Sequence, residues 1–220
     1  MARCGRLLPG PRRYLRRVID LPRTRRALES YVPTLVPDAG RPLAAVAMVL
    51  TERDGRPEVL LIERAKREGD PWSGHMAFPG GRVEREDPGV REAAERETFE
   101  EVGIALDRAE LLGRLDDLEG LTGRTPPLVI SAFVYFHAAP GPIAPSPEVE
   151  QALWVPLDAL VDPERRVDLA YPAAAGSSLY PGIRVGHPER HIVWGLTYRF
   201  VEIFFRALER PLPDRWPASR

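Results

Sequence analysis

Three glutamates in one short segment are the residues whose types and spacing suggest chemistry. Glu97, Glu100 and Glu101 lie three and four positions apart within residues 90–102, a stretch rich in Ala, Glu and Arg. On an α-helix these carboxylates share one face. Like charges this close repel one another, so such a face is either left in water or holds a cation. Carboxylate oxygens suit the hard divalent ions Mg²⁺ and Mn²⁺.

Neighbouring residues bear on that choice. Arg96 lies four positions before Glu100, where its guanidinium can orient the carboxylate and offset part of the repulsion. Gly80 and Gly81 precede the segment by a loop, and glycines let a backbone approach a metal ion or a phosphate closely. The carboxylates alone favour an ordinary solvated acidic helix. The functional interpretation therefore depends on the combination of these residues.

In its order, the combination resembles the Nudix box, the family pattern G-x5-E-x7-R-E-U-x-E-E-x-G-U, in which U is aliphatic. The second half of the box follows Phe78-Pro79-Gly80-Gly81. There are three departures: Asp87 replaces the first glutamate, eight residues rather than seven separate it from Arg96, and Thr98 replaces an aliphatic residue. The extra residue fits most easily in a loop, where insertions cost little. The matching positions are Arg96, Glu97, Glu100, Glu101, Gly103 and Ile104.

The resemblance implies a fold and a reaction. Nudix proteins have an α/β/α sandwich around a mixed β-sheet, and they hydrolyse a diphosphate that links a nucleoside to another group. In such a reaction the metal neutralises phosphate charge and activates water. The resemblance implies that Arg96 keeps the carboxylates in place. The implied ligands of Mg²⁺ or Mn²⁺ are Glu97, Glu100, Glu101 and the carbonyl of Gly80.

The reaction also needs a general base. In the family this base is a glutamate of the box or of a distant loop. Glu148 and Glu150 precede Trp154 at the place where a loop glutamate is expected, and we take Glu148 as the candidate. Each of the two also fits a solvated loop acid.

A second resemblance concerns the substrate. Residues 60–65 (LLIERA) and 74–81 (GHMAFPGG) are similar to the signature of the coenzyme A diphosphatase branch, L-L-T-x-R-S/A, x3, R, x3, G, x3, F-P-G-G. Ile62 replaces threonine, the spacing is one residue longer, and the second arginine falls on Asp70, so that Arg67 or Lys66 would supply its charge. Arginines suit the diphosphate and 3′-phosphate of coenzyme A. The expected substrate contacts are Arg64, Arg67, His75, Gly80 and Gly81.

We therefore expect a metal-dependent diphosphatase that cleaves coenzyme A or an acyl-CoA into adenosine 3′,5′-bisphosphate and 4′-phosphopantetheine. Three alternatives stay open: the same chemistry on ADP-ribose or a (d)NTP-type substrate, a non-catalytic Nudix-fold ligand-binding module, and a nucleic-acid contact through the N-terminal arginines. The intact glutamates argue against the binding module. The formal net charge of −1 makes nucleic acid an unlikely partner.

The elements that must position these residues indicate an α+β fold, with a mixed sheet and helices packed on it. Residues 162–190 are rich in Pro and Gly and show few periodic signals, so we expect no regular element there. The expected strands are Leu43–Leu50, Glu58–Glu63, Ala77–Phe78, Leu111–Leu115, Leu128–His137 and Leu153–Val155. The expected helices are 90–102, Pro156–Val161 and about Trp194–Leu208.

Composition sets the domain organisation. The 220 residues, 44% hydrophobic and 29% charged, are typical of one globular domain. Residues 1–30 hold nine arginines against two acids, so we expect an Arg-rich helical extension and linker over 1–40, with the helix interrupted at Pro22. The main domain then covers 41–210 and a tail 211–220. No apolar run approaches the roughly 20 residues of a membrane span.

The single cysteine, Cys4, fits a reducing compartment, so we expect a cytoplasmic protein. A small nucleoside diphosphate derivative is the expected partner, and a homodimer is allowed for.

Overall fold

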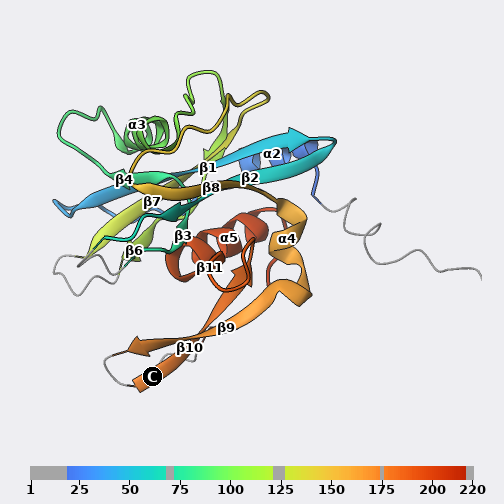
Figure 1. Ribbon diagram of the computed structural model, residues 1–220. Coiled ribbons are helices and arrows are strands. Elements are labelled where there is room, and N and C mark those ends of the chain that lie inside the picture. Colours follow the sequence, from blue (N-terminus) through green and yellow to red (C-terminus); the bar gives the residue numbers. More distant parts are fainter. Residues whose placement is uncertain (1–18, 68–71, 121–126, 174–175, 217–220) are drawn as a thin grey trace, which may run out of the picture.

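The computed structural model describes residues 19–67, 72–120, 127–173 and 176–216 (Figure 1). Its helices are α2 (Leu21–Ser30), α3 (Val90–Val102), α4 (Leu157–Val161) and α5 (Gly195–Ala207), with a short 3₁₀ turn at Pro163–Arg165. Its strands are β1 (Leu43–Arg53), β2 (Arg56–Arg64), β3 (Met76–Ala77), β4 (Gly80–Arg82), β5 (Glu110–Arg114), β6 (Leu118–Gly120), β7 (Leu128–Phe136), β8 (Val149–Pro156), β9 (Arg166–Ala173), β10 (Gly176–Arg184) and β11 (Ile192–Trp194).

The main sheet is mixed. Its central order is β3-β2-β1-β7-β5, and β4, β6 and β8 pair with β1, β7 and β2 respectively. Strands β1 and β7 run parallel, while the other pairs are antiparallel. The loop-rich connection from β2 to α3 thus runs through two short strands, β3 and β4. These strands carry the Phe78-Pro79-Gly80-Gly81 segment into the middle of the sheet.

Both faces of this sheet are covered, and β1 shows why. Alternate side chains of a strand point to opposite faces. Met48 and Leu50 belong to the apolar core that contains α5, whereas Ala47 and Val49 belong to the core beneath α3. A strand buried on both faces is apolar along its length, as β1 is from Leu43 to Leu50. The expected α/β/α sandwich around a mixed sheet is therefore confirmed (Figure 1).

The expectation for the Pro- and Gly-rich C-terminal region was wrong. Residues 162–190 were expected to hold no regular element, but β9 and β10 form a hairpin within them, and β11 extends it to a three-stranded sheet. The hairpin projects away from the main sheet (Figure 1). Pro172 and Pro181 interrupt the alternating pattern that normally reveals a strand, which hid the hairpin in the sequence. Strands β4 and β6 were also missed, since each has only three residues.

The arginine-rich N-terminal segment is described from residue 19 onward. There α2 begins at Leu21, and the side chain of Asp20 caps it by accepting a hydrogen bond from the N–H of Arg23. Pro22 stands in the first turn, where its missing N–H has no cost. The proline thus starts a helix rather than interrupting one. The helix expected before it lies outside the described residues.

Among the helices of the described ranges, none has both the length and the apolar character needed to cross a membrane.

Candidate active site

Helix α3 presents its glutamates from a fixed base. Ala93, Ala94 and Val102 are buried against the sheet. The helix ends at Gly103, which adopts a left-handed φ of 72° and donates its N–H to the carbonyl of Phe99. Thr98, which departs from the family pattern, is also buried, and its hydroxyl donates to the carbonyl of Ala94 at 2.7 Å. This hydrogen bond explains how a threonine replaces an aliphatic residue here.

The three glutamates differ in environment. Glu101 is 4% exposed, and its Oε2 accepts a hydrogen bond from the N–H of Gly80 at 2.9 Å. Glu97 is half-buried beside Gly81, where an added Cβ would collide with its carboxylate. Glu100 has a side chain that is 56% exposed. Gly80 thus contacts the carboxylate of Glu101 through its N–H. A contact between its carbonyl and a metal ion stays a prediction.

Arg96 joins this group to the loop before the helix. Its guanidinium donates to Glu97 and Glu100, each at 3.0 Å. It also forms a two-pronged ion pair with the buried carboxylate of Asp87, with both hydrogen bonds at 2.9 Å. This ion pair holds the pKa of Asp87 below its usual range. Asp87 therefore fixes Arg96 despite the extra residue between them. The altered spacing of the box had obscured this ion pair in the sequence.

The donor chemistry of the site fits a divalent cation. Burial raises the pKa of Glu101 to about 7, and the neighbouring charge of Glu97 adds to the effect. Burial likewise raises the pKa of Glu97. A buried and a half-buried carboxylate that repel one another are stabilised by a nearby cation. Within the described part of the chain, however, no three acidic or histidine side chains already stand close enough together to hold a metal ion.

A proline-rich loop brings a fourth glutamate to the site. The N–H groups of Ala144 and Ser146 donate to the carbonyls of Val102 and Glu101, so the loop is bound to the C-terminal end of α3. The next residues carry Glu148, whose charge contributes to the raised pKa of Glu101. Glu148 forms an ion pair with Arg67 at 2.8 Å, and both side chains are about half exposed.

The remaining expected site residues lie at the end of β2. Arg64 is close enough for its charge to lower the pKa of Glu101, against the larger effect of burial. Its N–H donates to the carbonyl of His75 at 3.1 Å. The ring of His75 packs edge-on against Trp194, with ring centres 4.8 Å apart. The structure thus gathers Arg64, Arg67 and Glu148 around the α3 carboxylates, whereas the His75 ring packs against Trp194 of β11.

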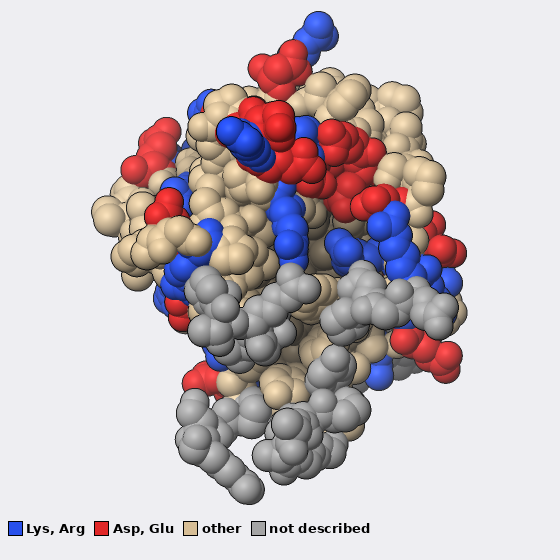
Figure 2. Space-filling view, turned by 90° about the vertical axis from the view of Figure 1, so that its left-hand side faces the viewer, with Lys and Arg blue, Asp and Glu red and all other residues tan. Residues whose placement is uncertain are grey.

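The charge distribution is consistent with this grouping. Acidic side chains gather in the upper part of one face, where α3 lies, and basic side chains lie among and below them (Figure 2).

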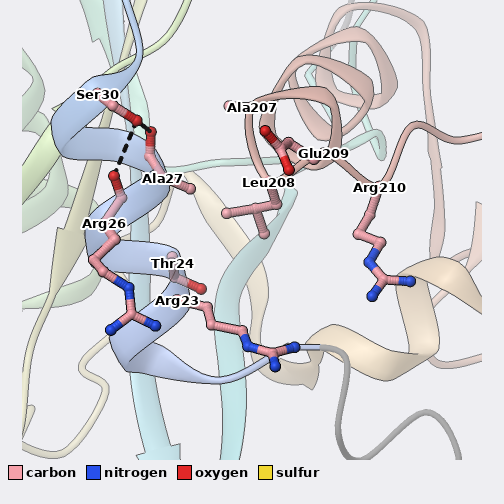
Figure 3. A pocket seen from close by; sticks show the side chains of 9 residues that line it. All are labelled: Arg23, Thr24, Arg26, Ala27, Ser30, Ala207, Leu208, Glu209 and Arg210. Atoms are coloured by element: carbon pink, nitrogen blue, oxygen red, sulfur yellow. Dashed lines mark hydrogen bonds between the residues drawn. The ribbon is translucent and has the colours of Figure 1, made fainter.

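A cavity of about 510 Å³ lies elsewhere (Figure 3). It opens between α2 and the end of α5, both of which pack on the sheet face opposite α3. Arg23, Arg26 and Arg210 line it together with Glu209. Its α5 side is the C-terminal end of a helix, which disfavours anions. Its lining holds one acidic residue and no glycine, in contrast to the site on α3.

Known proteins resemble this chain in sequence and in fold. The model of the family described as "NUDIX domain" matches residues 41–174. A Schizosaccharomyces pombe protein, "Uncharacterized protein C14C4.10c", is 32% identical over 76% of this chain and 63% of its own length. "Uncharacterized Nudix hydrolase NudL" of Citrobacter koseri is 34% identical over 46% of this chain and 53% of its own length. The chain thus spans a little more than half the length of these relatives.

Among solved structures, a MutT/nudix family protein from Enterococcus faecalis aligns with 92% of this chain and 76% of its own, with a TM-score of 0.51 and 17% identity. At that identity the likeness shows the fold alone. The family model covers more than half of the chain and includes α3 with its preceding glycines. The chain therefore belongs to the NUDIX domain family.

Proposed function

We propose that the chain is a metal-dependent hydrolase that cleaves a nucleoside diphosphate linked to another group, with coenzyme A or an acyl-CoA as substrate. The observation that carries the proposal is the clustering around α3. Buried Glu101, half-buried Glu97, the two glycines of β4, and the cations Arg64 and Arg67 come together beside α3. Acidic groups that suit a divalent cation thus lie beside arginines that suit phosphate oxygens.

Glu97, Glu100 and Glu101 are the proposed ligands, with the carbonyl of Gly80 as a further one. A bound Mg²⁺ or Mn²⁺ supplies charge neutralisation to the diphosphate and lowers the pKa of a water molecule. Arg96, fixed by Asp87, restrains the directions of Glu97 and Glu100. Arg64 is proposed to bind a phosphate oxygen, because its charge already acts on the carboxylate of Glu101.

Glu148 is the proposed general base. Its charge acts on Glu101, and the hydrogen bonds of its loop to the end of α3 support this assignment. It accepts a hydrogen bond from Arg67 in the free protein. The ion pair between them is largely exposed, so it contributes little stability and opens easily. A phosphate group that binds Arg67 would release Glu148 to take a proton from water.

The substrate assignment rests on the sequence similarity and on the place of the arginines. The second arginine of the branch signature falls on Asp70, which lies outside the described residues. Arg67 lies three positions earlier, at the site. We propose that it binds the 3′-phosphate that distinguishes coenzyme A from ADP-ribose.

A substrate panel tests this function. Purified protein with Mg²⁺ is given coenzyme A, ADP-ribose and dNTPs at equal concentrations, and the products are separated by chromatography. The proposal expects adenosine 3′,5′-bisphosphate and 4′-phosphopantetheine from coenzyme A at the highest rate. Preferred cleavage of ADP-ribose or of a dNTP would keep the hydrolase and reject the substrate. Binding without turnover would favour the ligand-binding module.

A substitution separates the two parts of the proposal. Arg67→Ala should raise KM for coenzyme A about tenfold or more, through loss of one charge-assisted contact, while KM for 3′-dephospho-coenzyme A changes little. Glu148→Ala is the matched control, because it breaks the same ion pair and keeps the arginine. It should lower kcat instead. An equal KM effect on both substrates would contradict the 3′-phosphate contact.

The remaining expectations stay proposals: a cytoplasmic location, a domain over residues 41–210 and a homodimer. Size-exclusion chromatography with light scattering tests the homodimer, and a molar mass near the monomer's 24.6 kDa would reject it.

A further inference from the structure

A buried pair of ionisable side chains includes Glu63, which directly precedes Arg64 on β2. Glu63 is 2% exposed and His191 is 3% exposed, and Nε2 of His191 lies 3.1 Å from Oε2 of Glu63. They are 128 positions apart in the sequence. Glu63 is the second-last residue of β2, whereas His191 directly precedes β11. The region matched by the family model ends at residue 174, so His191 lies beyond it.

Hydrogen bonds determine how the pair is held. The backbone N–H of His187 points at Nδ1 of His191, 2.8 Å away. A backbone N–H can only donate, so Nδ1 accepts and the ring proton is on Nε2. That proton is donated to Glu63, while Arg190 places a positive charge 3.7 Å from the same oxygen. The backbone at Gly186 packs directly against the imidazole ring of His191, since a Cβ there would collide with Nδ1.

The position of Glu63 on its strand connects this pair to the site. The pairing of β2 with β8 shifts register between Glu63 and Arg64, so that Arg64 is opposite Val149 and Glu150 is skipped. A bulge of this kind changes the direction of the next side chains. The bulge therefore sets the direction of Arg64, which follows Glu63 and is the proposed phosphate-binding arginine. Ala65 comes next, and its N–H donates to the carbonyl of Glu148.

From this arrangement we infer that Glu63 and His191 are positioning residues: His191, held by the β10–β11 turn, fixes Glu63 at the bulge and so directs Arg64 toward the diphosphate. The inference rests on the proposed function. It assigns the C-terminal unit, which includes β9, β10, β11 and α5, a part in substrate binding that acts through β2. Breaking the pair should move Arg64 without touching the carboxylates of α3.

A paired substitution tests the inference in a folded protein. Removing one partner would leave the other buried and uncompensated, which is strongly destabilising. Glu63→Met together with His191→Leu replaces both by apolar side chains of similar size, which proteins tolerate well. KM should rise about tenfold, with kcat within about threefold of the parent. Loss of a negative charge near an anionic substrate would alone lower KM, so a rise separates positioning from simple electrostatics.

Coupling to Arg64 distinguishes positioning from a general loss of structure. In an Arg64→Ala background, the paired substitution should change KM by less than about twofold, because the side chain that it misdirects is absent. His187→Ala is the matched control: it removes a nearby imidazole but keeps the backbone N–H that binds His191, so kinetics should match the parent. Circular dichroism and the melting temperature verify folding of every variant.

The outcomes separate the inference from the proposed function. A parent protein that cleaves no member of the panel rejects the proposed function. If the parent is active and the paired variant folds with an unchanged KM, the inference alone is overturned. The inference is also overturned if the KM effects of the paired substitution and of Arg64→Ala multiply. If the paired variant does not fold, Glu63→Asp takes its place in the same cycle. It keeps the charge but shortens the side chain by one methylene group, and the same rise in KM and the same coupling to Arg64 are expected.

Discussion

Burial separates the three glutamates of α3, although they lie within one turn of each other. Glu101 is held in the interior by a single backbone donor, whereas Glu100 reaches solvent and is shared with Arg96. A buried carboxylate is costly to ionise without a cation, so Glu101 is the residue whose charge a bound metal should stabilise most.

Glu101→Gln tests that role. The substitution keeps the shape and the hydrogen bond from Gly80 but removes the charge, so kcat with Mg²⁺ should fall at least about 100-fold. Steady-state kinetics on the best substrate of the panel measures the effect. Glu92→Gln, a substitution in the first turn of the same helix, should stay within about twofold of the parent. Undiminished activity in Glu101→Gln would contradict the assignment.

Asp87 leads to a prediction about stability and pH. Because Arg96 lowers its pKa in the folded protein, the carboxylate stabilises the fold above its unfolded pKa of about 3.9, and this contribution is lost as pH falls through the folded pKa. Asp87→Asn should therefore cost about 2 kcal/mol of unfolding free energy at pH 7. Urea denaturation should show a constant difference from pH 7 to about pH 5 that shrinks only in more acidic solution. A difference that grew on acidification would have the wrong sign.

At the scale of elements, the two glycines of β4 have separate tasks. Gly80 has a φ of +150°, and a Cβ there would collide with the backbone of β1. At Gly81 the collision would be with the mobile end of the Glu97 side chain. The first glycine serves the fold, and the second leaves room for a carboxylate.

Alanine substitutions should separate these tasks. Gly80→Ala should lower the unfolding free energy by at least about 2 kcal/mol, because the backbone cannot give way. Gly81→Ala should fold nearly as well as the parent but lose at least about tenfold in kcat, since Glu97 is displaced. Gly141→Ala, in open space, is the control for both. Denaturation curves and kinetics that ranked the first two variants in the opposite order would refute this division.

The sequence was sufficient for the local elements and for the identity of the family. Helix α3 with its Gly103 end, the apolar β1 and the order of the box residues each follow from short-range patterns. It was insufficient for contacts made by tertiary structure. The Glu63–His191 pair spans 128 positions, and the β9–β10 hairpin is masked by its prolines. The difference in burial between Glu97, Glu100 and Glu101 also depends on the packing of α3 and on Gly80.

At the scale of the whole molecule, the C-terminal unit completes the core. The family model ends at residue 174, yet α5 contributes Phe200, Phe204 and Phe205 to the core beneath the main sheet. Strand β1 would expose one apolar face without that helix. This packing supports a folding unit that extends to about residue 210.

Truncation tests this unit. A chain that ends at residue 174 should fail to give a cooperative thermal transition, because several large core side chains are lost at once. Phe204→Ala in the full chain should cost about 4 kcal/mol, the usual effect of emptying a fully buried phenylalanine site. A truncated chain that melts cooperatively would show that residues 41–174 suffice.

The central claim is that the α3 carboxylates bind a divalent cation, and Mn²⁺ titration followed by electron paramagnetic resonance of the free ion measures this directly. The account predicts a bound Mn²⁺ in the parent protein and in Glu92→Gln, and an affinity at least about tenfold weaker in Glu101→Gln. Equal Mn²⁺ binding by Glu101→Gln and the parent, or no binding by the parent, would contradict it.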